Sequence, residues 1–136
     1  MSQILVHPFF WDDTKKLLFL KDASERFEIE DANAVIVQTV ETEAEEVVGT
    51  DWGTKLDQFL IDNLGKYRKY NFGAVRDLLR VIRNKSHHYR GQKYPNITHT
   101  DLPLEVQQAL GPLPDGFLGY FLSRYPKLFM HTVSSS

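Results

Sequence analysis

The sequence predicts a single all-α domain, on three observations. Apolar residues recur at helical spacing along most of the chain. Asp, Pro and Gly stand where these periodic stretches begin and end. The 136 residues are 42% hydrophobic, which suits one buried core, and no linker-like composition divides them. We therefore expect residues 1–136 to fold as one domain.

The first expected helix spans residues 12–30, where apolar and charged side chains interleave and Asp12 or Asp13 can cap the start. The aromatic segment HPFFW, residues 7–11, precedes it, and we expect this segment to pack on a neighbour rather than face water. Residues 31–48 are rich in β-branched side chains and fit either a helix or a strand. Their Ala content and acidic end favour a helix.

Another helix is expected in residues 49–65, where Thr50 or Thr54 can cap the start and Gly65 ends the element. A short basic and aromatic connector, residues 66–73, leads to a helix over residues 74–89. Residues 91–100 are polar and contain Gly and Pro, which indicates a loop.

The C-terminal part begins with Pro103, which suits the first turn of a short helix over residues 103–110, and Gly111 ends that helix. Residues 112–133 are expected to form one or two further helices, broken near Pro126. No stretch approaches about 20 consecutive apolar residues, so we expect no membrane contact by this domain. The chain has no cysteine, which indicates a reducing compartment.

The helix over residues 74–89 has two distinct faces. One face should pack on the core, and it carries Val75, Leu78, Leu79, Ile82, Ser86 and Tyr89. Nearly opposite lies a polar stripe of Asp77, Arg80, Asn84 and His88, flanked by Arg76, Arg83 and His87. One end of a well-anchored helix therefore presents basic, amide and imidazole groups, and such a support can hold a catalytic group in place.

The formal net charge is only −2, but the charges are unevenly distributed. Residues 22–62 contain twelve acidic residues against two basic ones, whereas residues 66–93 contain nine basic residues against one acidic residue, Asp77. A basic segment of this kind favours a polyanionic partner. A set of solvated helix faces has the same composition, so charge alone leaves both interpretations open.

Three functions fit the end of this helix, besides a solvated terminus in which histidine compensates the helix dipole. A metal site is disfavoured, because the adjacent His87 and His88 point about 100° apart on a helix and the arginines around them repel a cation. The second function is nucleic-acid binding through phosphate contacts. The third is metal-independent RNA cleavage, which needs a base, an acid and cationic donors for the charged phosphorane. Histidine and arginine suit these roles, and Tyr70 lies among the nearby bases.

Several separated motifs resemble one known family. The run NLGKYRKYNFGAVRDLLRVIRNKSHHYR, the later DLPLEVQQALGPLPDGFLGYFLSRYPKLF and the upstream HPFFW are similar to kinase-extension nuclease (KEN) domains, in the same order. KEN domains form the C-terminal ribonuclease of the inositol-requiring endoplasmic-reticulum stress sensor, and a more distant version occurs in ribonuclease L. The resemblance extends from His7 to about Val133, and GPLPDGF and RNK-x-HH fit the stress-sensor branch better.

The resemblance implies a compact, HEPN-related domain that cleaves stem-loop RNA without metal or cofactor. The products would carry 2′,3′-cyclic phosphate and 5′-hydroxyl ends, in RNA splicing or decay during the unfolded-protein response. Carried over by position, His88 is implied as the general acid and Tyr70 as the base or a base-assisting group. Arg83 is implied to hold the scissile phosphate and Asn84 to position it. His87 is expected to be structural or supporting.

Further RNA contacts are expected from the basic segment, through Lys69, Arg76, Arg80, Lys85 and His87. Family members usually have only a residue or two between HHYR and the LP helix, so residues 91–100 resemble an inserted loop. The family also implies a longer parent protein on the cytosolic side of the endoplasmic-reticulum membrane, with a kinase domain in cis. It implies a homodimer for activity, whereas an isolated domain can be monomeric. The alternative is a non-catalytic RNA-binding or dimerisation module on the same fold.

Overall fold

The computed structural model describes residues 7–31, 33–66, 69–87 and 103–135. Every regular element within these ranges is helical, which confirms the predicted all-α class. The α-helices are α1 (Asp13–Ile29), α2 (Val35–Glu41), α3 (Ala44–Val48), α4 (Gln58–Gly65), α5 (Val75–His87), α6 (Leu104–Leu110), α7 (Asp115–Arg124) and α8 (Leu128–Ser135). Two short 3-10 helices are η1 (Pro8–Phe10) and η2 (Trp52–Lys55).

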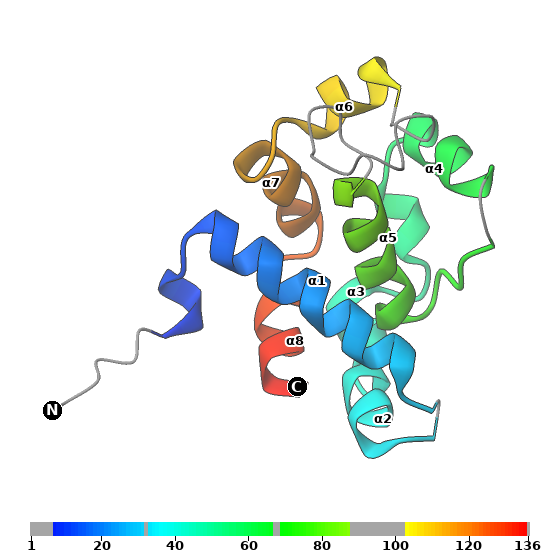
Figure 1. Ribbon diagram of the computed structural model, residues 1–136. Coiled ribbons are helices and arrows are strands. Elements are labelled where there is room, and N and C mark those ends of the chain that lie inside the picture. The colour runs from blue at the N-terminus through cyan, green and yellow to red at the C-terminus, as the bar shows by residue number, and fades with distance from the viewer. Residues whose placement is uncertain (1–6, 32, 67–68, 88–102, 136) are drawn as a thin grey trace, which may run out of the picture.

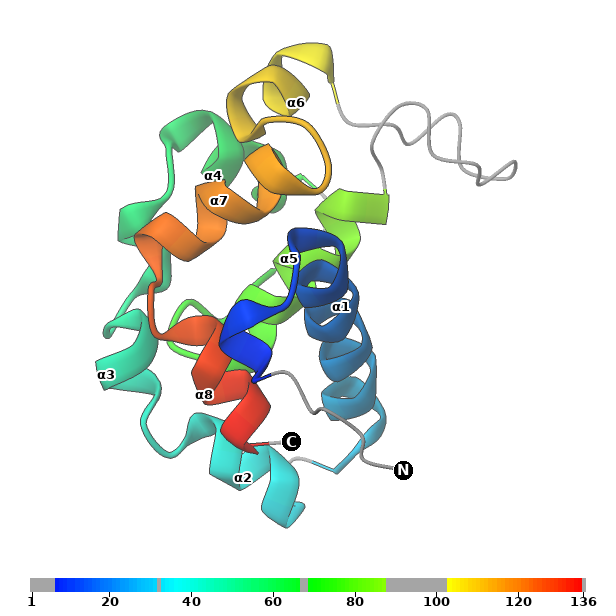
Figure 2. The ribbon, with the colours of Figure 1, turned by 90° about the vertical axis from the view of Figure 1, so that its left-hand side faces the viewer.

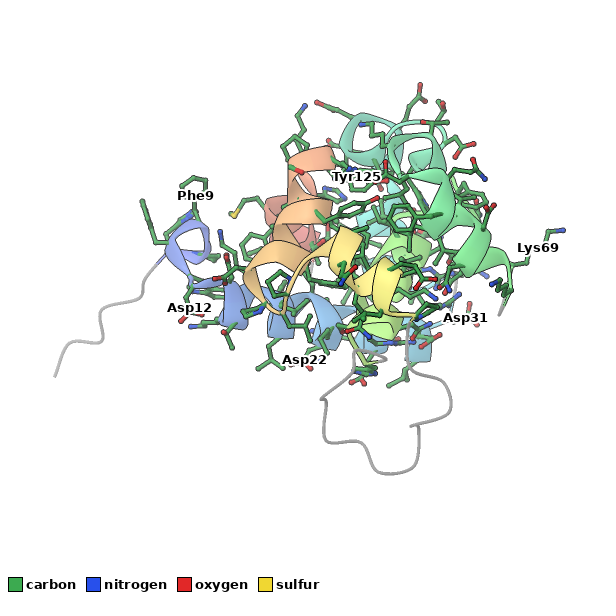
Figure 3. The ribbon with its side chains drawn as sticks, turned by 90° about the horizontal axis from the view of Figure 1, so that it is seen from above. Phe9, Asp12, Asp22, Asp31, Lys69 and Tyr125 are labelled. Carbon is green, nitrogen blue, oxygen red and sulfur yellow. The ribbon has the colours of Figure 1, made fainter. Side chains whose placement is uncertain are left out.

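Two neighbouring helices, α1 and α5, organise the fold. They lie side by side in both views, with α6 and α7 at one end of the pair and α2 and α8 at the other (Figures 1 and 2). The largest fully buried side chains come from segments throughout the chain and include Leu20, Phe27, Trp52, Leu60, Leu78, Phe117, Phe121 and Tyr125. Tyr125 lies among packed side chains from several helices in Figure 3. One shared core therefore holds α1 and α5 in place.

The predicted start of the first helix and the favoured helical conformation of residues 31–48 are confirmed. Asp12 caps α1, since its carboxylate accepts a hydrogen bond from the Lys15 amide at 2.8 Å. The ambiguous segment 31–48 is helical, in two pieces, α2 and α3. Near the break, the hydroxyls of Thr39 and Thr42 donate to backbone carbonyls four residues earlier, a bond that competes with regular helix geometry.

The predicted threonine caps of the next helix are wrong. Asp51, rather than Thr50 or Thr54, caps a 3-10 helix by accepting from the Gly53 amide at 2.8 Å, and α4 begins only after Asp57. The reason is tertiary. Trp52 is fully buried, and inserting its indole into the core turns the chain through η2 before α4 can start.

The C-terminal helices begin and end near the residues predicted from the sequence, with one difference. Pro103 precedes α6 in an extended conformation instead of lying in its first turn, and Gly111 ends α6 with a φ of 95°. The break near Pro126 is confirmed between α7 and α8. Tyr125, the residue before that proline, has the non-helical backbone that a following proline favours.

The aromatic segment 7–11 packs on the domain only in part. The Trp11 ring contacts Phe19 and Phe129 edge-on, with centroid distances of 5.7 and 5.9 Å. Phe9 and Phe10 are 62% and 74% exposed, and Phe9 lies at the edge of the molecule in Figure 3. The expectation of a packed segment is therefore right for Trp11 and wrong for the two phenylalanines. None of the described helices has the length and apolar character needed to cross a bilayer.

Candidate active site

Helix α5 carries most of the candidate residues, and one of its faces packs on the core. Its predicted core face is confirmed at Val75, Leu78, Leu79, Ile82 and Ser86, all buried, whereas Tyr89 lies outside the described residues. Residues of the opposite stripe, Arg80 and Asn84, are only partly buried.

The N-terminus of α5 is capped from another helix. Glu41, the last residue of α2, accepts hydrogen bonds from the amides of Val75 and Arg76 at 2.8 and 2.9 Å. The first amides of a helix have no partner within that helix and attract negative charge. The carboxylate therefore gives hydrogen-bond partners to two amides in the first turn of α5.

A single carboxylate from α1 holds two arginines of α5. Glu28 lies in the last turn of α1, and its two oxygens accept from Nε of Arg80 at 2.8 Å and from Nη2 of Arg83 at 2.5 Å. Arg80 also reaches Asp77 at 3.5 Å. The Arg83 side chain is only 10% exposed, so its guanidinium is both paired and largely enclosed.

Glu28 and Arg83 line a pocket of about 470 Å³ between the C-terminal ends of α1 and α5. Its lining residues are Glu25, Glu28, Ile29, Arg83, Asn84 and His87. The structure thus brings together three of the predicted residues, Arg83, Asn84 and His87, beside two carboxylates. His88 lies outside the described residues, so its position relative to this pocket is not part of the structure.

Tyr70 is held by a different set of contacts. It is buried, and its ring meets Trp52 edge-on with a centroid distance of 6.3 Å. Trp52 Nε1 donates to the carbonyl of Ala74 at 2.9 Å, and Asp77 accepts from the Asn71 amide at 2.6 Å. These bonds fix the connector between α4 and α5, and with it the tyrosine.

Tyr70 and Arg83 line different pockets. The pocket beside Tyr70 has a volume of about 480 Å³ and is lined by Ile61, Leu64, Gly65, Lys69, Tyr70 and Phe72. Lys69 points outward at the edge of the molecule in Figure 3. Neither of these two pockets contains both Tyr70 and Arg83.

Lys85 was expected on an RNA-binding surface but is buried instead, with 4% exposure. Its ammonium donates to Oδ1 of Asn63 on α4 at 2.7 Å. Burial lowers the pKa of Lys85 from 10.5 to about 8. Its place in the α4–α5 interface argues for a structural contact rather than direct contact with phosphate.

Arg76 is also tied to the fold. It is half-buried, and Nη1 donates to the carbonyl of Phe27 at 3.3 Å while Nε lies 3.9 Å from Glu41. Within the described ranges, His, Asp and Glu side chains form no group of three or more that could hold a metal ion.

Sequence reasoning missed the residues that position the candidates, above all Glu28, Glu41 and Trp52. Glu28 and Glu41 are two of the twelve acidic residues in segment 22–62, and no local pattern distinguishes them from their neighbours. Each acts on a helix that is distant in the sequence. Only the packing of α1 and α2 against α5 shows which carboxylates matter.

Comparison with known proteins adds an independent finding. A family model described as Ribonuclease 2-5A matches residues 16–135. The chain is 47% identical over 130 residues to the sensor for unfolded proteins in the ER of Schizosaccharomyces pombe, which covers 94% of this chain and 11% of the relative.

Two further relatives show the same pattern. The serine/threonine-protein kinase/endoribonuclease ire-1 of Caenorhabditis elegans is 43% identical over 133 residues, covering 98% of this chain and 13% of the relative. The human serine/threonine-protein kinase/endoribonuclease IRE2 is 43% identical over 130 residues, covering 96% and 13%. The chain therefore spans only a small part of the length of the curated relatives it matches.

Proposed function

The chain belongs to the ribonuclease 2-5A family, the family of KEN domains, and on that premise we propose that it is an endoribonuclease domain acting on stem-loop RNA. The observation that supports this most directly is the pocket at the end of α5, where Arg83, Asn84 and His87 meet. A guanidinium on a rigid helix is suited to hold a phosphate by paired hydrogen bonds.

The proposed reaction needs no metal ion. The 2′-oxygen of the RNA attacks the adjacent phosphorus as Tyr70 removes or helps to remove its proton, and the bond to the 5′-oxygen breaks as His88 donates a proton to that oxygen. Arg83 holds the phosphate and stabilises the charge of the phosphorane, and Asn84 positions it. The products carry a 2′,3′-cyclic phosphate and a 5′-hydroxyl.

The parent protein is proposed to resemble the relatives in its wider organisation. Their names combine a kinase with an endoribonuclease, or describe a sensor for unfolded proteins in the ER. We accordingly propose a kinase domain in cis, a position on the cytosolic side of the ER membrane, and a homodimer as the active form. Substrates would then be RNAs spliced or degraded in the unfolded-protein response.

The test is cleavage of a labelled stem-loop RNA in the presence of EDTA. We expect the parent to cut, and Arg83→Ala and His88→Ala to lose activity by about 100-fold or more, because each removes a group that acts on the transition state. Lys127→Ala is the matched control, since Lys127 is 61% exposed and pairs only at the surface with Glu46 among the described contacts. If both site variants cut as fast as the control, the assignment is wrong.

Two further measurements separate catalysis from mere binding. A dimer-dependent nuclease gains specific activity as its concentration rises, whereas RNA binding without cleavage at every concentration would support a non-catalytic module. With chemistry rate-limiting, the rate should also fall as pH rises above neutrality, because His88 must be protonated to act as the acid. A rate that stays flat from about pH 6 to 9 would argue against that role.

A further inference from the structure

Glu28 of α1 forms an ion pair with Arg83, the proposed phosphate-binding residue of α5. We propose that Glu28 is a positioning residue for RNA cleavage, whose carboxylate orients the Arg83 guanidinium toward the scissile phosphate. This inference rests on the proposed ribonuclease function and adds a residue of α1 to a site otherwise carried by α5 and the connector before it.

Contacts with α5 hold Glu28 and its neighbour in place. Its neighbour Phe27 is 1% exposed in the core, and the Phe27 carbonyl accepts from Arg76 of α5. The end of α1 is therefore tied to α5 at Arg76, Arg80 and Arg83. The Glu28 carboxylate itself is bound on both oxygens, at 2.8 and 2.5 Å.

Arg80 and Arg83 have different partners, and this difference indicates different roles. Arg80 lies between two carboxylates, Glu28 and Asp77, which indicates a structural part. Among the contacts of the described residues, Arg83 meets a carboxylate only through Nη2, so the other edge of its guanidinium can face the pocket that it lines. An arginine side chain loses rotamer entropy when it is ordered, and a guanidinium that is already bound loses less of it when phosphate arrives.

Removing the charge of Glu28 should affect substrate binding and the chemical step in opposite ways, which distinguishes a positioning residue from a binding residue. A carboxylate beside the phosphate site repels RNA, so removing its charge should strengthen binding of the substrate. Removing its hold on Arg83 should slow the chemical step, because small misplacements of a catalytic group cost large factors in rate. A residue that only stabilised the fold would produce neither effect on the folded enzyme.

The experiment compares kcat and KM on a stem-loop RNA for the parent, Glu28→Gln and Asp22→Asn. Glutamine keeps the size of the side chain but weakens its hold on two guanidiniums. We expect Glu28→Gln to lower kcat by about tenfold or more without raising KM. Asp22→Asn removes the same charge from an exposed position of α1 and should match the parent. Circular dichroism and urea unfolding confirm that each variant is folded.

A double-mutant cycle shows whether Glu28 acts through Arg83. In the Arg83→Ala background, Glu28→Gln should have no further effect on kcat, because the group that it positions is gone. Equal effects in both backgrounds or an unchanged kcat would each overturn the positioning role. If the parent itself cuts no RNA, the ribonuclease proposal fails as well, whereas loss of activity in Arg83→Ala with full activity in Glu28→Gln overturns the inference on Glu28 alone.

Discussion

The carboxylate of Glu41 should contribute strongly to stability, because it caps the helix that carries the site. Glu41→Ala removes two hydrogen bonds from backbone amides to a charged acceptor, at 2.8 and 2.9 Å. Hydrogen bonds to charged groups contribute about 1.5–3 kcal/mol each, and deletion of a helix cap typically costs about 0.5–2 kcal/mol. The Glu41 side chain is 26% exposed, so water can replace part of the loss. We expect the free energy of unfolding to fall by about 2–4 kcal/mol.

Urea unfolding followed by circular dichroism measures this loss, with the slope of the transition unchanged. Glu41→Gln should lose about half as much, because its amide keeps one acceptor oxygen but turns an NH₂ group toward the second amide. Glu45→Ala is the matched control, since Glu45 is exposed on the neighbouring helix α3, and it should change stability by no more than about 0.5 kcal/mol. A Glu41→Ala variant as stable as this control would refute the capping argument.

Three other changes test the packing around the site. Burial lowers the Lys85 pKa to about 8, so between that value and 10.5 the unfolded chain binds a proton that the folded chain does not, and stability rises with pH. Relative to Lys85→Met, the parent should therefore gain about 2 kcal/mol of unfolding free energy from about pH 7 to 9.5, and a difference independent of pH would contradict the low pKa. Tyr125→Phe removes a buried hydroxyl that donates to the Trp52 carbonyl and should cost about 1–2 kcal/mol in urea unfolding; a loss below about 0.5 kcal/mol would mean that the carbonyl finds another donor. Gly116→Ala would place a methyl group 2.5 Å from Cδ of Pro112. This clash should reduce the free energy of unfolding by about 1–3 kcal/mol and lower the thermal midpoint. An unchanged midpoint would show that the α6–α7 turn can open.

Local pattern was sufficient for much of the fold. The spacing of Val75, Leu78, Leu79 and Ile82 predicted which face of α5 is buried, because one helical face must leave water whatever its partner is. Asp12 was correctly included among the candidate caps of α1 for an equally local reason, the bond to an amide three residues on. Such contacts lie within one turn of the chain, so sequence spacing defines them.

Local pattern failed where a distant contact competed with it. Thr50 and Thr54 have the chemistry of helix caps, but burial of Trp52 turns the chain at that point and Asp51 becomes the cap. Lys85 belongs to a basic segment and was expected at the surface, yet its ammonium donates a hydrogen bond to Asn63 inside the α4–α5 interface. Propensity contributes less than about 1 kcal/mol per residue, whereas burial of a large side chain contributes about 1.5–3 kcal/mol, so packing prevails.

By itself, the sequence determined the helical class, the buried face of α5 and a family resemblance that the comparisons confirmed. It also singled out the candidate residues by chemical type. Only the tertiary structure decided the surroundings of these residues: Glu28 on Arg83, Trp52 against Tyr70, and Glu41 at the start of α5. The physical reason is that charge pairing and burial depend on distance in space, and each of these contacts joins segments far apart in the chain.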